Sequence, residues 1–492
     1  MTTLAPSLAV LPLEQRYARL PEPLWARAQV TPLDDPWVVA WSDDAARALG
    51  LDPAARRDPA TLEAINGRRA LGVEPVAAAY AGHQFGVWVP RLGDGRAVSL
   101  GEARTPAGET WDVQVKGSGR TAFSRVFDGR AVLRSSVREL LASEALDALG
   151  VPTTRALCVV GSRTPVQREE VETGALLVRL APTHVRLGTF EYVARSHPEH
   201  LAALADFIVA EDLAGAVDPA APDRYQRLLE EAARRTARLV AAWQAHGFVH
   251  GVLNTDNLSI VGLTLDYGPF AFVEAFDPGL VVNHSDPGGR YAFDRQPEVC
   301  LWNLGRLAVA LAPLVPREAA EAALEAFAPE FARTYRELMR HKLGLAAWRD
   351  DDDDLLLSLL QAMADGEADL ALTFRALGRV DPADEASQAS VQAAFRDSRP
   401  WAAVAARYAA RLRQDGLDPA ARRAAMDRVN PRYVLRTHLA QRAIERAEAG
   451  DGGEVERLLR VLRRPFDEQP GEEAYALPPP ADAPPVVLSC SS

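Results

Sequence analysis

Cysteine and long apolar runs are both scarce in this chain of 492 residues. The three cysteines, Cys158, Cys300 and Cys490, are too few for a disulfide framework or a zinc site, so we expect a reducing, cytoplasmic setting. No stretch of about 18 apolar residues occurs, which argues against a membrane span. No basic segment precedes the short apolar run near the N-terminus, so we do not expect secretion.

Lysine is almost absent. Lys116 and Lys342 are the only two, and 53 of the 55 basic residues are arginines. A compact ammonium and a planar guanidinium are not equivalent, so a lysine retained in such a chain suggests a site that requires it. Chance retention is the alternative, and it is our interpretation of Lys342. The 67 acidic residues make the net charge −12, which disfavours non-specific binding of nucleic acid or anionic membranes.

The pattern of apolar residues predicts an α+β fold. The sheet part contains one expected helix at 130–149, and Gly93-Asp94-Gly95 is predicted to be a hairpin turn between its first two strands. Its strands are expected at 85–89, 96–102, 111–117, 153–161 and 174–182. Beyond it we expect a long helix over 225–243 and short strands around 259–268.

Five segments follow from these changes of pattern. They are an N-terminal extension (1–75), a mainly antiparallel sheet lobe (76–197), a mainly helical lobe with two polar loops (198–320), a helical region (321–470) and a flexible tail containing Cys490 (471–492).

Lys116 closes the segment WDVQVKG, whose apolar and polar residues alternate as in a strand. The helix that follows carries Glu139 and Glu144, and either glutamate could reach the lysine. A strand lysine oriented by a helix glutamate binds nucleotide phosphates in protein kinases. An ordinary surface ion pair is the alternative for this feature alone.

Two polar loops follow the long helix. HGVLNTDN ends in Asp256 and Asn257, and an apolar stretch ends nine residues later at Asp266, before Tyr-Gly. Carboxylate and amide oxygens suit Mg²⁺, whose coordination is completed by water and nucleotide phosphate. Turn chemistry is the alternative for each loop taken separately.

The order of these features is that of the two-lobed protein-kinase fold. One position departs from it. Aligning His250 and Asn257 with the kinase pattern H-R-D-x-x-x-x-N puts Val252 where the catalytic aspartate stands. Valine cannot accept a proton from a substrate hydroxyl, so ordinary γ-phosphoryl transfer is not expected. Asp256, directly before the asparagine, is the carboxylate that remains in this loop.

Several long motifs in this order resemble the selenoprotein O family, over most of residues 30–445. They include AGHQFGVWVPRLGDGRA, WDVQVKGSGRTAFSRVFDGRAVLRSSVRELLASEAL, FVHGVLNTDNLSI, LDYGPFAF and RYAFDRQPEVCLWNLGRLA. The family has a pseudokinase-like fold and transfers AMP from ATP to protein hydroxyls, with the nucleotide inverted relative to kinases. Cys490, before two serines, stands where some members carry selenocysteine. Cys158 and Cys300 lie in apolar segments and are expected to be buried.

The resemblance also implies residue roles. Asp256 would accept the proton, Glu139 would orient Lys116, and Asn257 with Asp266 would hold Mg²⁺ or Mn²⁺. The nucleotide would contact Gly93, Gly95, Arg96, Lys116, Asp128, Gly129, Arg179, Arg186 and Asp266.

The expected function is transfer of AMP from ATP to Ser, Thr or Tyr hydroxyls of proteins, with release of pyrophosphate and without nucleic-acid or membrane partners. Three alternatives remain open. They are UMP transfer from UTP, a true phosphotransferase that uses Asp256 as a displaced base, and a catalytically silent nucleotide-binding scaffold.

Overall fold

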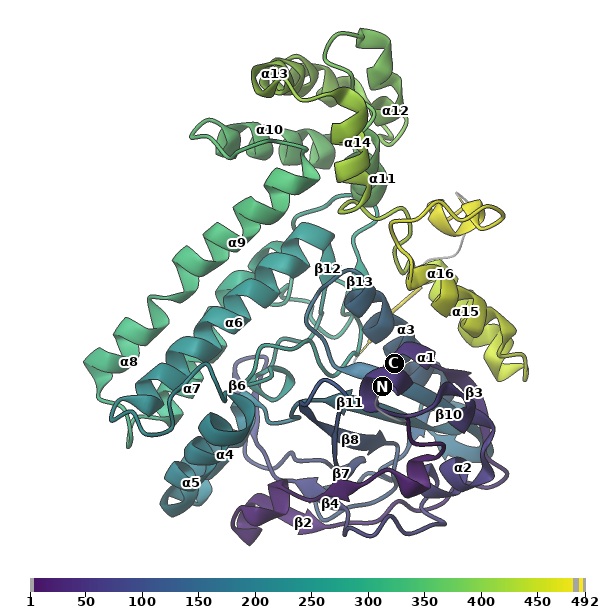
Figure 1. Ribbon diagram of the computed structural model, residues 1–492, viewed down its shortest axis with the longest axis vertical. Coiled ribbons are helices and arrows are strands. Elements are labelled where there is room, and N and C mark those ends of the chain that lie inside the picture. Colours follow the sequence, from purple (N-terminus) through teal and green to yellow (C-terminus); the bar gives the residue numbers. More distant parts are fainter. Residues whose placement is uncertain (1–3, 481–485, 490–492) are drawn as a thin grey trace.

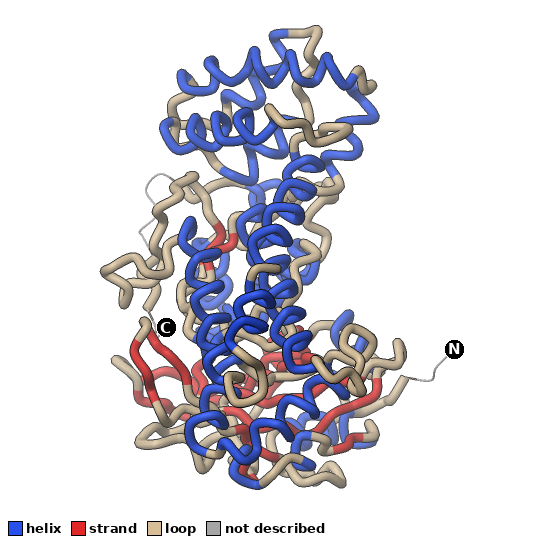
Figure 2. The backbone as a smooth tube through the Cα atoms, turned by 90° about the vertical axis from the view of Figure 1, so that its left-hand side faces the viewer, coloured by secondary structure: helices blue, strands red, loops and turns tan. Residues whose placement is uncertain are grey.

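The computed structural model describes residues 4–480 and 486–489, so Cys490 lies outside the described residues. A large antiparallel sheet occupies the N-terminal half and helices dominate the C-terminal half (Figures 1 and 2), as the α+β prediction requires. Within the described ranges, no helix is long and apolar enough to cross a membrane.

The sheet is built from nine strands, and residues before position 75 supply three of them. β1 (Leu13–Glu14) pairs with β7 (Ala97–Arg104), and β9 (Ala131–Val132) pairs with β11 (Val171–Ala181), beside the main path. The main path runs β2 (Trp25–Arg27), β4 (Val76–Ala78), β7 (Ala97–Arg104), β8 (Thr110–Lys116), β11 (Val171–Ala181), β10 (Arg155–Gln167) and β3 (Trp37–Trp41).

Strand register decides which polar side chains of the sheet meet. Lys116 on β8 stands opposite Leu177 of β11, and Gln114 stands opposite Arg179. Because side chains alternate along a strand, Gln114 and Lys116 share one face of β8. The register therefore brings Arg179 next to the face that carries the lysine.

Two predictions about strands are wrong. The stretch 85–89 does not pair with the strand after it. Instead β5 (Gly82–Gln84) and β6 (Val87–Val89) form a hairpin of their own. The turn at Gly93–Gly95 packs on a later loop, where Thr121 donates a 2.7 Å hydrogen bond to the carbonyl oxygen of Asp94. The stretch 259–268 makes only isolated bridges, because its backbone bonds go to 152–154 and 185–187.

The helices cover the sheet and extend away from it. α3 (Leu133–Ala148), close to the predicted 130–149, packs on β10 and β11, and α15 (Thr437–Glu448) and α16 (Gly453–Leu462) pack on α3. The short helices α1 (Asp43–Leu49) and α2 (Pro59–Ile65) lie beside the sheet (Figure 1).

The helical half begins after the sheet. It comprises α4 (Leu187–Ser196), α5 (Leu201–Phe207), α6 (Arg224–His246), the pair β12 (Phe248–Val249) and β13 (Ala271–Phe272), α7 (Gln296–Ala310), α8 (Arg317–Leu324) and α9 (Phe327–Lys342). Figure 1 shows α9 leading to a group at the end opposite the sheet: α10 (Asp352–Asp365), α11 (Leu370–Leu377), α12 (Ala389–Gln392), α13 (Arg399–Asp415) and α14 (Pro419–Asp427). Cys158 in β10 and Cys300 in α7 are buried free thiols.

Candidate active site

Lys116 forms a buried ion pair with Glu139 of α3. Burial lowers the pKa of Lys116, and the carboxylate of Glu139 opposes that change. Glu144, the other glutamate considered for this role, binds the guanidinium of Arg155 through two contacts of 2.9 Å and is not available to the lysine. The structure thus pairs the strand lysine with the first of the two glutamates.

Asp266 lies between two buried arginines. Arg179 Nη1 is 2.5 Å from Asp266 Oδ1, and Arg186 binds Asp266 Oδ2. Burial alone would raise the pKa of Asp266, but Arg186, Arg179 and Lys116 hold it well below its usual range. The carboxylate is therefore ionised at neutral pH.

The charges of this centre do not cancel. Lys116, Arg179 and Arg186 supply three positive charges, whereas Glu139 and Asp266 supply two negative ones. A buried centre with an excess of positive charge is suited to bind the anionic phosphates of a nucleotide.

Asp256 is buried in the loop after β12 and keeps one oxygen free. Gln84 Nε2 donates to Asp256 Oδ2 at 3.1 Å, while Oδ1 has no hydrogen-bond partner among the residues that the structure describes. Burial raises the pKa of Asp256 to about 7. Arg186 also donates to the carbonyl oxygen of Asp256 at 2.6 Å, so one arginine links this loop to Asp266. A carboxylate with a free oxygen and this pKa is suited to accept a proton near neutral pH.

Asn257 and Asp266 provide oxygen atoms for a metal ion. The side-chain nitrogen of Asn257 donates to the carbonyl oxygen of Val252 at 3.1 Å, which leaves the amide oxygen available. In the described part of the chain, no group of three or more His, Cys, Asp or Glu residues could hold a metal. Both oxygens of Asp266 already bind arginines, so a metal ion at this position would share the carboxylate with Arg179 and Arg186, and phosphate and water would have to complete its coordination.

The glycine turn meets the loop that follows Lys116. A Cβ added to Gly95 would lie 2.9 Å from the carbonyl oxygen of Phe123, so only glycine allows this close approach. The amide of Gly119 donates to the carbonyl oxygen of Gly129 at 2.9 Å and closes the base of the loop. The carbonyl oxygen of Arg96 accepts a 2.6 Å bond from Gly117, directly after the lysine.

Asp128 lies at the surface, away from the buried charges expected to contact the nucleotide. It is exposed and pairs with Arg168 at 2.8 Å. Burial would raise the pKa of Asp128, but its hydrogen bond to Arg168 lowers it. Its neighbours Val126 and Phe127 are also exposed. The structure brings the turn and this loop together, but it directs Asp128 to the surface.

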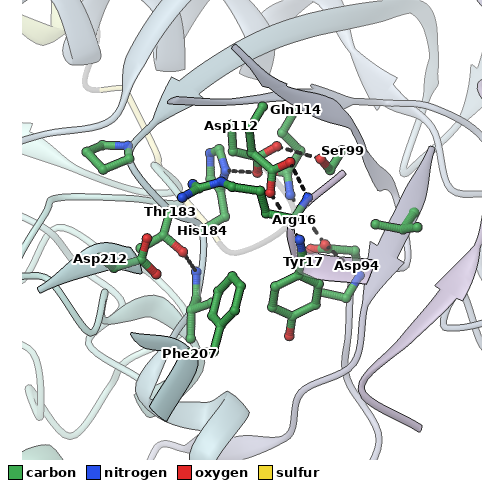
Figure 3. Close-up of a pocket in the computed structure, with 15 residues that line it drawn as sticks. Arg16, Tyr17, Asp94, Ser99, Asp112, Gln114, Thr183, His184, Phe207 and Asp212 are labelled. Carbon is green, nitrogen blue, oxygen red and sulfur yellow. Dashed lines mark hydrogen bonds and ion pairs between the residues drawn. The ribbon is translucent and has the colours of Figure 1, made fainter. Parts of the chain in front are cut away.

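A polar pocket, which we did not predict from the sequence, lies between the sheet and the segment after β11 (Figure 3). Asp112 binds Ser99 at 2.5 Å and His184 at 2.6 Å, and Asp94 and Asp212 also line the pocket. Asp112 lies on the same polar face of β8 as Lys116, and this alternation of polar and apolar residues could have indicated it from the sequence. These acids lie beside Arg16 and His184, so the pocket lacks the excess of positive charge that suits phosphates.

Comparison with known proteins identifies the family of this chain. A family model described as "Protein adenylyltransferase SelO" matches residues 7–463. The chain is 53% identical over 487 residues to protein nucleotidyltransferase YdiU of Thioalkalivibrio sulfidiphilus, covering 97% of this chain and 98% of the relative. It is 50% identical over 492 residues to protein nucleotidyltransferase YdiU of Thiobacillus denitrificans, covering 99% and 100%. The corresponding protein of Myxococcus xanthus is 50% identical over 491 residues, with 99% and 100% covered.

Proposed function

The chain belongs to the SelO family of protein adenylyltransferases, and we propose that it transfers AMP from ATP to Ser, Thr or Tyr hydroxyls of other proteins. It is a nucleotidyltransferase enzyme, as its family and its relatives named protein nucleotidyltransferase indicate. The observation that carries the proposal is that the cations suited to phosphates and the carboxylate suited to accept a proton lie in two separate, neighbouring places. Two buried arginines bind Asp266, Glu139 links one of them to the buried Lys116, and the free oxygen of Asp256 lies in the neighbouring loop.

In the proposed reaction the hydroxyl oxygen of the acceptor attacks the α-phosphorus of ATP. The bond between this phosphorus and the bridging oxygen breaks, and pyrophosphate leaves. Asp256 accepts the hydroxyl proton at Oδ1, while Lys116, Arg179 and Arg186 stabilise the negative charge of the leaving pyrophosphate. We therefore propose the inverted orientation of ATP, with the β- and γ-phosphates at the cations.

Other residues hold the reacting groups in place. Gln84 fixes the carboxylate of Asp256 through its second oxygen, and Glu139 orients Lys116. We propose that Asn257 and Asp266 hold Mg²⁺ or Mn²⁺, which supplies further positive charge for the phosphates. The glycine turn at 93–96 and the base of the loop at Gly129 would approach the nucleotide through their backbone.

Labelled nucleotides distinguish the possible reactions. The enzyme is incubated with protein acceptors, MgCl₂ or MnCl₂, and ATP labelled at the α- or the γ-phosphate. AMP transfer labels the acceptor from the α-position only, and label from the γ-position would instead establish a kinase. α-Labelled UTP tests UMP transfer in the same format. No label from any nucleotide would contradict the proposal and favour a scaffold.

A pair of variants tests the assigned base. Asp256→Asn keeps the shape of the side chain but removes the proton acceptor, so we expect AMP transfer to fall by about 10²–10⁴-fold. Asp218→Asn, at an exposed position, is the matched control and should transfer AMP at the wild-type rate. Equal activity of both variants would reject Asp256 as the base.

A further inference from the structure

Arginines and partly exposed tryptophans pack around the buried ring of His83, next to the catalytic loop. The ring of His83 lies 5.2 Å from Trp88 and 5.5 Å from Trp302. Arg195 lies 3.9 Å above Trp88, and Arg290 and Arg306 lie 4.8 and 4.9 Å from the ring of Trp302. We call these residues the arginine–tryptophan strip: Arg195, Trp88, His83, Trp302, Arg290 and Arg306.

The strip is assembled from elements far apart in the sequence. Arg195 belongs to α4, Trp88 to β6, and Trp302 and Arg306 to α7, while Arg290 lies in the loop before α7. Figure 1 shows β6 beside α4 and α7. Side chains that stack on tryptophan are held in place, so the guanidinium groups are already oriented before a partner arrives.

Among the described residues the arginines of the strip have no acidic partners, whereas the buried His83 beneath them contacts Glu191 at 2.6 Å. Across residues 4–480 and 486–489, none of Arg195, Arg290 and Arg306 forms an ion pair, although most other arginines of the chain do. The chain has 67 acidic residues and a net charge of −12, so acidic side chains are not lacking. A local surplus of positive charge on an acidic protein is suited to a negatively charged partner.

The β5–β6 hairpin, which carries His83 and Trp88 of the strip, also contacts the catalytic loop. Gln84, next to His83, binds Asp256, and the amide of Phe85 donates to Asn254 Oδ1 at 3.2 Å and to the hydroxyl of Tyr291 at 2.9 Å. Phe85 is 38% exposed at the tip of this hairpin. A peptide lying on the strip would therefore continue toward the proposed proton acceptor.

We propose that the strip binds an acidic segment of the acceptor protein, adjacent to the hydroxyl that receives AMP. This proposal rests on the proposed function, because the strip would select the substrate of that same site. Guanidinium groups bind carboxylates through paired hydrogen bonds, which gives both affinity and orientation. A protein segment is favoured over a nucleic acid because the enzyme modifies proteins and the chain as a whole is acidic.

Two fluorescent peptides test the proposal. Each has one serine, flanked by glutamates in the first peptide and by glutamines in the second. We measure peptide binding by fluorescence anisotropy and kcat/KM for transfer from α-labelled ATP. The wild-type enzyme should favour the glutamate peptide by about tenfold in both measurements, and added salt should reduce the preference.

Charge reversal provides the matched variants. Arg195→Glu combined with Arg306→Glu should abolish the preference for the glutamate peptide, with the Kd for ATP unchanged. Arg428→Glu reverses an exposed charge in the helical region after α14 and should keep the preference. If the reversed variant melts early, the pair Arg195→Ala and Arg306→Ala removes the charges without adding new ones and should lower the preference in the same direction.

Three results would overturn the proposal. They are equal binding of both peptides by the wild-type enzyme, an unchanged preference in the double variants, and tighter binding of a single-stranded RNA than of the glutamate peptide. The proposed function and the role of the strip can be contradicted independently of each other. Binding of the glutamate peptide without any AMP transfer would contradict the transferase assignment alone, whereas transfer without charge preference would contradict only the role of the strip.

Discussion

Gly82 lies against Asp256, the proposed proton acceptor, and replacing this glycine by alanine should move the carboxylate of Asp256. A Cβ at position 82 would lie 2.6 Å from Asp256 Oδ1 and 2.9 Å from Thr255 Oγ1. Both contacts are with side chains. The Asp256 oxygen must therefore withdraw by about 0.4–0.8 Å before ordinary contact returns.

The expected effect is on the reaction more than on the fold. Overpacking a well-packed site costs about 1–3 kcal/mol of stability, and here the flexible carboxylate can yield. Displacing a reacting group by close to 1 Å can cost about 10²-fold in rate. We therefore expect Gly82→Ala to lower kcat for transfer from α-labelled ATP by about 10²-fold, with a Kd for ATP near that of the wild type.

The control is Gly305→Ala in α7. Among the described residues nothing lies within 4 Å of a Cβ at position 305, so this variant should be fully active and at least as stable as the wild type. Thermal unfolding followed by circular dichroism verifies that both variants fold. Wild-type turnover by a folded Gly82→Ala enzyme would refute the position that we assign to Asp256.

Three further predictions follow from buried charges and close contacts. Asp266→Asn leaves the buried Arg186 without its counterion and leaves Arg179 with Glu139 alone, so it should abolish transfer and also lower the free energy of unfolding by about 3–5 kcal/mol, measured by urea titration. An unaltered unfolding midpoint would contradict the buried network. Gly129→Ala puts a Cβ 2.1 Å from the carbonyl oxygen of Gly119 and should weaken ATP binding measured by calorimetry, whereas Gly108→Ala, also at positive φ but with no described atom within 4 Å, should not. Burial raises the pKa of Asp212 from 3.8 to about 7, so its proton stabilises the folded state fully below about pH 3.8, and this contribution is lost as the pH rises through 7. The difference in melting temperature between Asp212→Asn and the wild type should therefore be larger, in favour of the variant, at about pH 8 than at about pH 5. A larger difference at about pH 5 would show that the carboxyl is ionised in the folded protein.

The strand that ends in Lys116 and the helix that follows it were predictable from the sequence, because alternation and helical period are local properties. So were the two polar loops, because Asp256, Asn257 and Asp266 stand directly after apolar segments. The absence of a carboxylate at Val252 was visible in the same way, and the family motifs identified the chemistry. None of these inferences needed contacts between distant segments.

Tertiary structure alone decided which groups meet. Periodicity places a residue on a face, but it does not give the register of the neighbouring strand or the position of one lobe on the other. For that reason periodicity alone left the choice between Glu139 and Glu144 open, and only the family resemblance indicated Glu139. Gly93–Gly95 was assigned to a hairpin that does not form. The two arginines around Asp266 and the strip across α4, β6 and α7 likewise depend on packing between segments distant in the sequence, since charges interact through space and not along the chain.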